Sequence, residues 1–547
     1  MRYSWLVTLC CFALGSCQGI NPRTASSAAP AHPVSIPQDE LLRHVRILAS
    51  NDYLGREPGT PGEDLAIGYI EQEFRKASLA PQVSGTYFQG VPVEQRSASG
   101  ALTIGGRSKK LTLSPDSDFN VQILSDGLKI EKAPIVFAGY GIVAPEFGRD
   151  DYANLDVHNK VVVVLAGEPD EMFDPARVRI GADAAEALGK AKRTYQRWDW
   201  VKQHNALVKG AKGIVIVVDD RRLLNKRQYF QQNYMIPSDS PSWAPPLSIM
   251  LSRSAFDRIA EAAETSAADL QLAARSPAFR PKRLQLSVTG NFKATKHTFN
   301  SHNVVGRIPG RGKGCVVMTA HWDGYGIDRS MAGDNIWNGA VDDAGGVAQL
   351  IEIARQLAIA PPPKRTIVFV ATTGEERGFL GARHFLAHTP CPDGEIAAVI
   401  NLDWFWELGR TRDFATHGLG YSSLDQVVQR LATAQGRGTT AINAYFGGGD
   451  QLPFLFAGIP GLHGGSWGTL IDRPKDFEDN YGAMMSNGAI LREGNSNRDE
   501  VREEWDISGA VQDAELLGEM ALELANTARV PCWTAESQFA IRARLCR

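Results

Sequence analysis

The sequence predicts an α/β protein in two parts: a mostly parallel mixed sheet flanked by helices, and an inserted β-rich module. After residue 301 the chain alternates strand-like and helix-like apolar patterns, as βαβ units with a parallel sheet do. Between residues 97 and 291 short β-rich runs dominate. The length of 547 residues also exceeds what one core holds, about 250–300 residues. We therefore expect two folded units.

The N-terminus resembles a secretion signal. An apolar run over residues 5–14 is too short to cross a bilayer but suits a signal-peptide core. It ends in Leu-Gly-Ser-Cys17, which resembles a bacterial lipobox, whose cysteine becomes the lipidated first residue; plain cleavage after a small residue is the alternative. We expect a signal peptide at 1–17 and a flexible Ala-, Ser- and Pro-rich linker at 18–36. The chain would then be exported to the periplasmic side of a bacterial membrane and anchored there by lipid.

The charge and the cysteine content of the chain say little about which molecules it binds. The 58 basic and 61 acidic residues give a net charge of -3, and no basic block suggests nucleic-acid binding. The sequence does not indicate an oligomeric state. Four cysteines lie beyond the signal, with no C-x-x-C pair, and Cys532 and Cys546 flank a C-terminal tail at 531–547. In an oxidising compartment these two would form a disulfide, and two free buried thiols are the alternative.

The inserted module divides one domain into two segments. Apolar spacing predicts helices over residues 38–49 and 64–79, which open a domain made of residues 37–96 and 292–530. The intervening residues 97–291 form the β-rich module. Its expected strands are 133–137, 161–165 and 213–218, with one long polar helix near 182–209.

The domain after the insert has ionisable residues at its strand ends. Strands are expected over 315–320, 365–371 and 397–403, with a helix over 347–358. In parallel sheets chemistry collects at the carboxyl ends of strands. Several carboxylates packed around an imidazole repel one another unless a divalent cation neutralises them, and imidazole and carboxylate ligands without thiolate suit zinc. The residues that follow the strands or precede the helix are His321, Asp323, Asp342, Asp343, Glu375, Glu376 and Asp403.

These motifs, in this order, resemble the M28 family of zinc peptidases, which includes bacterial aminopeptidases. The order is H-x-D, G-A-x-D-[ND], E-E and N-L-D, and the resemblance covers about residues 38–95 and 295–530. The insert resembles a protease-associated (PA) domain, with Phe-Ala-Gly-Tyr-Gly at 137–141 and Lys-Gly-Ile-Val at 212–215. The resemblance implies a zinc-exopeptidase fold and removal of N-terminal amino acids from peptides.

The family also implies a role for each matching residue. His321, Asp342 and Asp403 would bind one zinc, and Asp342 would bridge to a second zinc that Glu376 also holds. Asp323 would hydrogen-bond the other ring nitrogen of His321 and fix its tautomer. Glu375 would act as the general base toward the attacking water.

One ligand of the family pattern is missing. A late histidine normally completes the second zinc site, and Asn495 stands in its place ahead of the Trp505-Asp506-x-Ser-Gly run. Three explanations remain open: the second zinc is weak or absent, Asn495 is an oxygen ligand, or His463 substitutes as a ligand. Gly324 and Gln451 also replace histidines that are common in the family. One or two zinc ions are therefore expected.

Other functions compete with peptide hydrolysis. Gly464 to Gly468 matches G-x-S-x-G, but no histidine follows Ser466, as the triad of α/β-hydrolases requires, and H-E-x-x-H does not occur. A binding protein that has lost turnover and a glutaminyl cyclase with a single zinc remain as alternatives. Trp404 to Trp406 follow Asp403 and either line a side-chain pocket or pack in the core.

Overall fold

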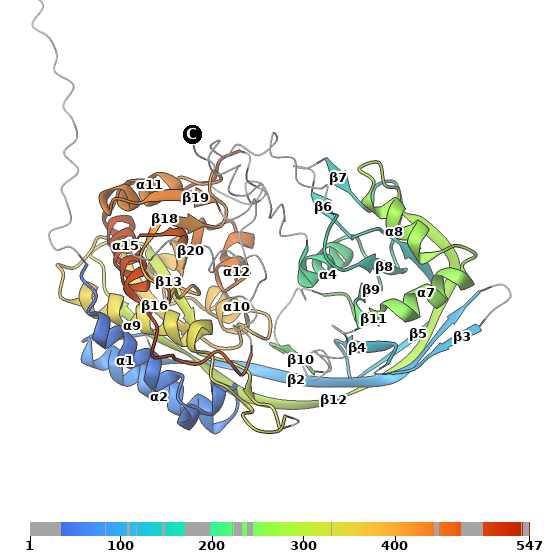
Figure 1. The fold of residues 1–547 in the computed structure, drawn as a ribbon, viewed down its shortest axis with the longest axis horizontal. Coiled ribbons are helices and arrows are strands. Elements are labelled where there is room, and N and C mark those ends of the chain that lie inside the picture. The colour runs from blue at the N-terminus through green and yellow to red at the C-terminus, as the bar shows by residue number, and fades with distance from the viewer. Residues whose placement is uncertain are drawn as a thin grey trace, which may run out of the picture.

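The structure, a computed structural model, consists of two lobes joined by a long β-ribbon (Figure 1). The described residues are 34–547 except 83, 107–109, 116, 145–147, 170–196, 221–222, 224–231, 238–243, 330, 442–447, 472–495, 536, 538, 540–545 and 547. We call residues 34–96 and 292–546 the helix-flanked lobe, and residues 97–291 the insert lobe. The expected signal peptide, most of the linker, Cys17 and Asn495 lie outside the described residues.

The ribbon consists of β2 (Phe88–Gly105) and β12 (Lys282–Ile308). They pair antiparallel from Val304↔Phe88 to Ser287↔Gly105 and run from one lobe into the other (Figure 1). The expected boundaries at 96/97 and 291/292 therefore fall within strands, and no loop separates the two parts. One continuous hydrogen-bonded ladder joins the lobes.

The helix-flanked lobe is built on a mixed sheet. Its strand order is β19-β18-β20-β17-β13-β16-β12. The strands β20, β17, β13 and β16 are parallel to one another, whereas β18 is antiparallel to β20 and β12 is antiparallel to β16. This agrees with the expected mostly parallel sheet. The bounds are β13 (Cys315–His321), β16 (Thr366–Thr372), β17 (Ile396–Asn401), β18 (Thr411–Thr416), β19 (Gly438–Ala441) and β20 (Gly461–Leu470).

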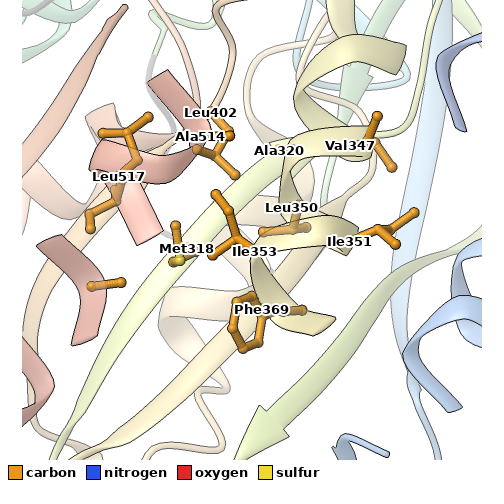
Figure 2. Packing of buried hydrophobic residues seen from close by; sticks show 14 of the residues in the cluster. Met318, Ala320, Val347, Leu350, Ile351, Ile353, Phe369, Leu402, Ala514 and Leu517 are labelled. Atoms are coloured by element: carbon orange, nitrogen blue, oxygen red, sulfur yellow. The ribbon is translucent and has the colours of Figure 1, made fainter. Parts of the chain in front are cut away.

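Helices cover both faces of this sheet because its central strands are apolar on both sides. Met318 and Ala320 of β13 belong to the core under one helical layer, whereas Cys315 and Val317 belong to the core on the opposite face. Figure 2 shows the first core, where Met318 and Phe369 pack near side chains of α9 and α15. The first layer is α1 (Gln38–Leu48), α2 (Pro61–Lys76), α9 (Gly345–Ala358), α11 (Leu424–Ala434) and α15 (Ser508–Asn526), and the opposite face carries α10 (Leu380–Ala387) and α12 (Gln451–Phe456).

The insert lobe contains the three strands that the sequence predicts, which lie in β5, β8 and β9, and it also contains helices. Its strands β5, β8, β9 and β11 are mutually parallel, and β4 closes the edge antiparallel to β11. Helices accompany them, so the lobe is itself a layered α/β unit. The bounds are β3 (Lys110–Leu113), β4 (Phe119–Ile123), β5 (Gly127–Phe137), β8 (Val161–Leu165), β9 (Gly213–Val218), β10 (Gln232–Met235), β11 (Leu247–Ser252), α4 (Asp199–Val208), α7 (Arg253–Ala262) and α8 (Ala267–Arg275).

The remaining elements are short. Residues 182–196 of the expected polar helix lie outside the described residues, and α4 occupies its C-terminal end. The short strands are β1 (Ala80–Pro81), β6 (Val143–Ala144), β7 (Arg149–Asp150), β14 (Gly326–Ile327) and β15 (Ile336–Trp337).

Both cysteine pairs beyond the signal are disulfides. Cys315 is bonded to Cys391, with Cα atoms 5.6 Å apart, and Cys532 to Cys546, with Cα atoms 5.1 Å apart. The second bridge closes the C-terminal tail, in agreement with the disulfide expectation. Among the described helices, none has the length and apolar content that a membrane crossing requires.

Candidate metal centre

The predicted site residues gather at the carboxyl ends of three adjacent strands. His321 is the last residue of β13, Glu375 and Glu376 follow β16, and Asp403 follows β17. The order β17-β13-β16 places β13 in the middle, and all three strands are parallel. Their ends therefore meet at one edge of the sheet, as the sequence predicts.

The two aspartates before α9 come from a tight turn at the same edge. Gly339 begins this turn with φ 58°, a left-handed conformation that suits glycine, and a short π-helical segment (Ala340–Ala344) follows. Asp342 and Asp343 lie inside it, joined by a cis peptide bond. A Cβ at Gly346 would lie 2.2 Å from Asp343 Oδ1, so only glycine lets α9 start this close to the turn.

The imidazole of His321 is the centre of the cluster. Its Nε2 lies 3.0 Å from Asp342 Oδ1 and 3.8 Å from Asp403 Oδ1. The possible ligand atoms form two groups, and within each group they all lie within 4.8 Å of one another. One group is His321, Asp342 and Glu376, and the other is His321, Asp343 and Asp403. The structure thus brings together the four residues that we predicted as ligands, and it adds Asp343.

Asp343 differs from Asp342 in what its carboxylate contacts. Its Oδ2 accepts the backbone N–H of His321 at 3.0 Å, and its Oδ1 accepts that of Gly346 at 2.9 Å. Asp343 is fully buried, whereas the Asp342 side chain is 20% exposed. The buried aspartate holds the turn to β13, and Asp342 is the one whose carboxylate faces the imidazole nitrogen.

Two further buried residues support the turn, and the sequence analysis did not single them out for this site. Arg56, which is 1% exposed, donates to the carbonyls of Trp322 at 2.8 Å and Gly339 at 2.9 Å. Asp499 accepts the backbone N–H groups of Val341 at 2.8 Å and Asp342 at 3.0 Å. Both contacts join segments more than 150 residues apart, so no local sequence pattern predicts them.

The electrostatics of the cluster are those of a site that needs a cation. Burial would lower the pKa of His321, but the nearby carboxylates of Asp323 and Asp342 outweigh it and hold that pKa well above its usual value. Burial raises the pKa of Glu375, Glu376 and Asp403, and neighbouring carboxylates raise each of them further. Such crowding is relieved when a divalent cation neutralises the oxygens.

Several carboxylate oxygens also lack a partner. Among the described residues Glu376 Oε1, Asp323 Oδ2 and Asp450 Oδ1 are buried without a hydrogen bond. Burial raises the pKa of Asp450 to about 7, and its Oδ2 accepts the Thr372 hydroxyl. Buried unsatisfied oxygens are costly, and a bound cation would satisfy those that face it.

Tyr325 is another residue at the cluster that sequence reasoning missed. Its hydroxyl donates to Glu376 Oε2, and its ring lies edge-on to Trp337 with centroids 5.1 Å apart. The guanidinium of Arg377 lies 5.3 Å from the centre of the same ring. The tyrosine therefore orients one of the predicted ligands.

Asp323 contacts His321 differently from the expectation. Its backbone carbonyl lies 2.9 Å from His321 Nδ1, whereas its carboxylate Oδ1 is 3.7 Å away. That carboxylate oxygen instead accepts the backbone N–H of Glu375 at 3.0 Å. The backbone thus orients the imidazole, and the side chain of Asp323 connects the segment after β13 to the segment after β16.

His463 has a partner outside the carboxylate cluster. Its Nε2 lies 2.8 Å from the backbone carbonyl of Asp403, and its Nδ1 is 3.4 Å from Gln451 Nε2. Burial lowers the pKa of His463 to about 4, so the ring is neutral and donates through Nε2. In the described part of the chain, neither ligand group includes it. This contact suits a residue that positions the backbone at Asp403.

Ser466 belongs to a buried structural network. Its hydroxyl donates to Asp513 Oδ1 at 3.0 Å and accepts from Arg437 Nη2 at 3.0 Å. Arg437 and Asp513 form a fully buried ion pair 2.8 Å apart. The hydroxyl is thus already engaged, which agrees with the prediction that the G-x-S-x-G match is no nucleophile.

The three aromatic residues after Asp403 differ in how deeply they are buried. Phe405 and Trp406 are buried. Trp404 is half-buried and lies beside His417, His463 and Trp467, with ring centroids 5.7, 5.8 and 5.9 Å away. Two of the three aromatic residues are therefore core packing.

Comparisons with known proteins agree with this site. The profile of Peptidase family M28 matches residues 303–491. A "Probable zinc metalloprotease" of Pyrenophora tritici-repentis is 51% identical over 65 residues, which are 12% of this chain and 15% of that protein. "Leucine aminopeptidase 1" of Trichophyton equinum is 30% identical over 115 residues, which are 20% of this chain and 30% of that protein.

A solved structure is similar over a longer stretch. The aminopeptidase from Aneurinibacillus sp. strain AM-1 covers 91% of this chain and 96% of its own, with 17% identity and a TM-score of 0.47. The matched segment of 303–491 includes His321, Asp342, Glu375, Glu376 and Asp403. Residues 303–491 are therefore similar to Peptidase family M28.

Proposed function

We propose that this protein is a zinc-dependent aminopeptidase, which removes amino acids from the N-terminus of peptides. The observation that carries the proposal is the convergence of His321, Asp342, Glu376 and Asp403 at the ends of adjacent strands, beside Glu375. The match to Peptidase family M28 over these residues supports it.

The donor set fits zinc. It offers one imidazole nitrogen and carboxylate oxygens, with no thiolate, and Glu376 Oε1 is buried without a hydrogen-bond partner among the described residues. We assign His321, Asp342, Glu376 and Asp403 as the ligands. When bound, zinc would supply a Lewis acid that polarises the scissile carbonyl and makes water acidic.

The number of ions follows from how the donors are arranged. Both ligand groups share His321, whose Nε2 lies near Asp342 of one group and near Asp403 of the other. Asn495 stands where a further histidine would complete a second site, and His463 is bonded to the carbonyl of Asp403. We therefore propose one tightly held zinc, with a second site that is weak or absent.

Glu375 is the proposed general base. Its carboxylate is partly buried near Asp403, Glu376 and Asp450, and its backbone N–H donates to the carboxylate of Asp323. From this position Glu375 would accept a proton from the attacking water and return it to the leaving amine. Asp323 acts as a positioning residue for both Glu375 and His321.

The proposal is tested with aminoacyl anilides. Purified protein should hydrolyse an aminoacyl p-nitroanilide, lose this activity with a chelator, and regain it when zinc is added back. The N-acetylated form of the same substrate should be stable, because an aminopeptidase needs a free α-amino group. Equal cleavage of the blocked substrate would indicate an endopeptidase, and no cleavage of any anilide would contradict the proposal.

A single zinc also keeps glutaminyl cyclisation as a second candidate, since cyclases of similar fold use one ion. The shared His321 in both ligand groups is the observation that favours it. Incubation with an N-terminal glutaminyl peptide distinguishes the two reactions. Release of free glutamine supports the aminopeptidase, and loss of ammonia with the peptide chain intact supports the cyclase.

We also propose that the chain is exported and that a lipid anchors it at Cys17. We further propose that the insert lobe is a PA-like domain. Two disulfides support an oxidising compartment, and the apolar run at 5–14 supports export. Mass spectrometry of the mature N-terminus in a bacterial host tests the anchor. Acylation lost in Cys17→Ala supports it, whereas an unmodified mature N-terminus beyond Cys17 contradicts it.

A further inference from the structure

The insert lobe contains an open cavity of about 1020 Å³ that takes no part in the candidate metal centre. It is lined by residues of β2, β3, β5 and β12, at the end of the ribbon remote from β13 (Figure 1). Its volume is at the upper end of the range typical of sites for small ligands, about 300–1,000 Å³.

The lining carries positive charge from three separate strands. Lys110 of β3, Lys132 of β5 and Arg283 of β12 line the cavity, and no carboxylate does so among the described residues. Within the same part of the chain none of these three cations forms an ion pair, and the neighbouring Glu131 is engaged by Lys129. Three unpaired cations around one space make a region of positive potential that attracts anions.

The backbone is distorted at this cavity. The β5–β12 pairing is interrupted between Arg283 and Ser287, and again between Val288 and Gly290. Lys132 and Gln285, which both line the cavity, have φ values of 46° and 51°, a left-handed conformation that is unfavourable for residues other than glycine. Bulges and strained non-glycine residues of this kind cluster at functional sites.

Neutral groups complete the lining. The hydroxyls of Thr103 and Thr289 offer hydrogen-bond donors, and Thr289 Oγ1 accepts the backbone N–H of Lys132 at 3.3 Å. The Ser287 hydroxyl already donates to the carbonyl of Gly105 at 3.4 Å. Ile135 and Leu286 also border the cavity, but their side chains are almost fully buried in the core of the insert lobe. Charged and polar side chains therefore dominate the accessible lining.

We propose that this cavity binds a small anionic ligand, whose phosphate or carboxylate groups pair with Lys110, Lys132 and Arg283. The guanidinium of Arg283 suits two oxygens of one such group, and the lysines contribute point charges. The bulges of β5 and β12 hold these cations around the ligand. This site is independent of the proposed peptidase activity.

The test uses calorimetric titration of the purified full chain at low ionic strength. Inorganic pyrophosphate represents phosphate ligands and citrate represents carboxylate ligands. The test variant is Lys110→Gln/Lys132→Gln/Arg283→Gln. The matched control, Arg275→Gln/Lys293→Gln/Lys313→Gln, removes the same charge from exposed positions outside the cavity. A single Arg283→Gln variant serves if the triple variant does not fold by circular dichroism.

Wild type and control should bind at least one probe with equal affinity, and the cavity variant should bind it at least about tenfold more weakly. Binding of pyrophosphate alone identifies a phosphate ligand, and binding of citrate alone a carboxylate ligand. The proposal is overturned if neither probe binds wild type. It is also overturned if both triple variants lose affinity equally, because the effect would then reflect net charge alone.

Discussion

At the scale of single residues, the candidate centre combines one imidazole with crowded carboxylates whose roles differ by their contacts. Asp343 is engaged by two backbone N–H groups, whereas Asp342 faces His321 Nε2 at 3.0 Å. Glu376 is oriented by the Tyr325 hydroxyl, and Glu375 is fixed through its backbone. Because the contacts differ, separate substitutions can test the metal ligands, the general base and the residues that position them.

Replacing Glu375 with Gln should abolish most of the activity and leave the metal in place. The amide cannot accept a proton, so we expect kcat to fall by about 10²–10⁴-fold with the zinc content unchanged. Enzyme kinetics with elemental analysis measure both quantities. Glu503→Gln, an exposed control, should change neither. A Glu375→Gln enzyme with wild-type kcat would refute the assignment of the base.

Tyr325→Phe should weaken zinc binding. The variant removes the hydrogen bond to Glu376 and leaves that ligand free to rotate, so we expect a loss of about tenfold or more in zinc affinity. Competition against a chromogenic chelator measures the dissociation constant. Tyr87→Phe, whose hydroxyl bonds the carbonyl of Leu79, is the matched control. Unchanged zinc affinity in Tyr325→Phe would show that the contact does not position the ligand.

Much of the residue set was predictable, and the limits have physical causes. His321, Glu376 and Asp403 follow apolar runs that end at the sheet edge, so short-range pattern locates them. Which of Asp342 and Asp343 faces the His321 ring depends on the direction of each side chain within one turn. The spacing of residues in the sequence does not specify that direction. Arg56, Asp499 and Tyr325 act through contacts made only when distant segments meet.

At the scale of elements, the carboxyl ends of the central strands and the start of α9 position the residues of the candidate metal centre. The predicted strands at 315–320 and 365–371 became β13 and β16 with shifts of a single residue at their ends, because buried apolar runs have few alternatives. The ribbon strands β2 and β12 were not predicted at their full length. They alternate buried and exposed residues and carry many polar side chains, which a local pattern cannot distinguish from loops.

The helix α10 carries a pH-sensitive histidine. His384 stacks on His388 with ring centroids 4.2 Å apart, and burial, with a smaller contribution from His388, lowers the pKa of His384 to about 4. The unfolded chain binds this proton near its ordinary pKa of 6.5. Between these two values the unfolded state therefore holds more protons, so the free energy of unfolding should fall as the pH drops.

The variant His384→Phe should show a smaller fall in the free energy of unfolding over that pH window. Urea unfolding of the variant and wild type at about pH 7 and pH 5 measures the difference. His297→Phe, at an exposed position on β12, should keep the wild-type dependence. A His384→Phe variant with the full wild-type dependence would contradict the assignment.

At the scale of the whole molecule, the insert lobe is attached to the helix-flanked lobe by more than the ribbon. Trp200 of α4 packs edge-on against Phe379 and Phe456, with ring centroids 6.1 and 5.8 Å apart. His204 lies 5.7 Å from the same Phe456 ring, and Phe539 of the C-terminal tail lies 5.4 Å from it. The disulfide-closed tail and the insert thus meet on α12.

Trp200→Ala should loosen this contact. Losing two aromatic pairs should cost about 1–3 kcal/mol, and the amides of α4 and α12 should exchange hydrogen faster while those of β13 stay protected. Hydrogen exchange by mass spectrometry measures this. Leu272→Ala, which truncates a side chain 71% exposed on the insert lobe, is the control. Unchanged exchange in α12 would show that the contact does not hold the lobes together.

The central claim is that the edge of the sheet around His321 binds zinc, and the most direct measurement is zinc per chain by elemental analysis after dialysis. We predict one zinc per chain for wild type, the same for His463→Ala, and none for His321→Ala. No zinc in wild type would contradict the metal centre. Full zinc in His321→Ala would place the metal elsewhere, and zinc lost in His463→Ala would show that His463 is a ligand.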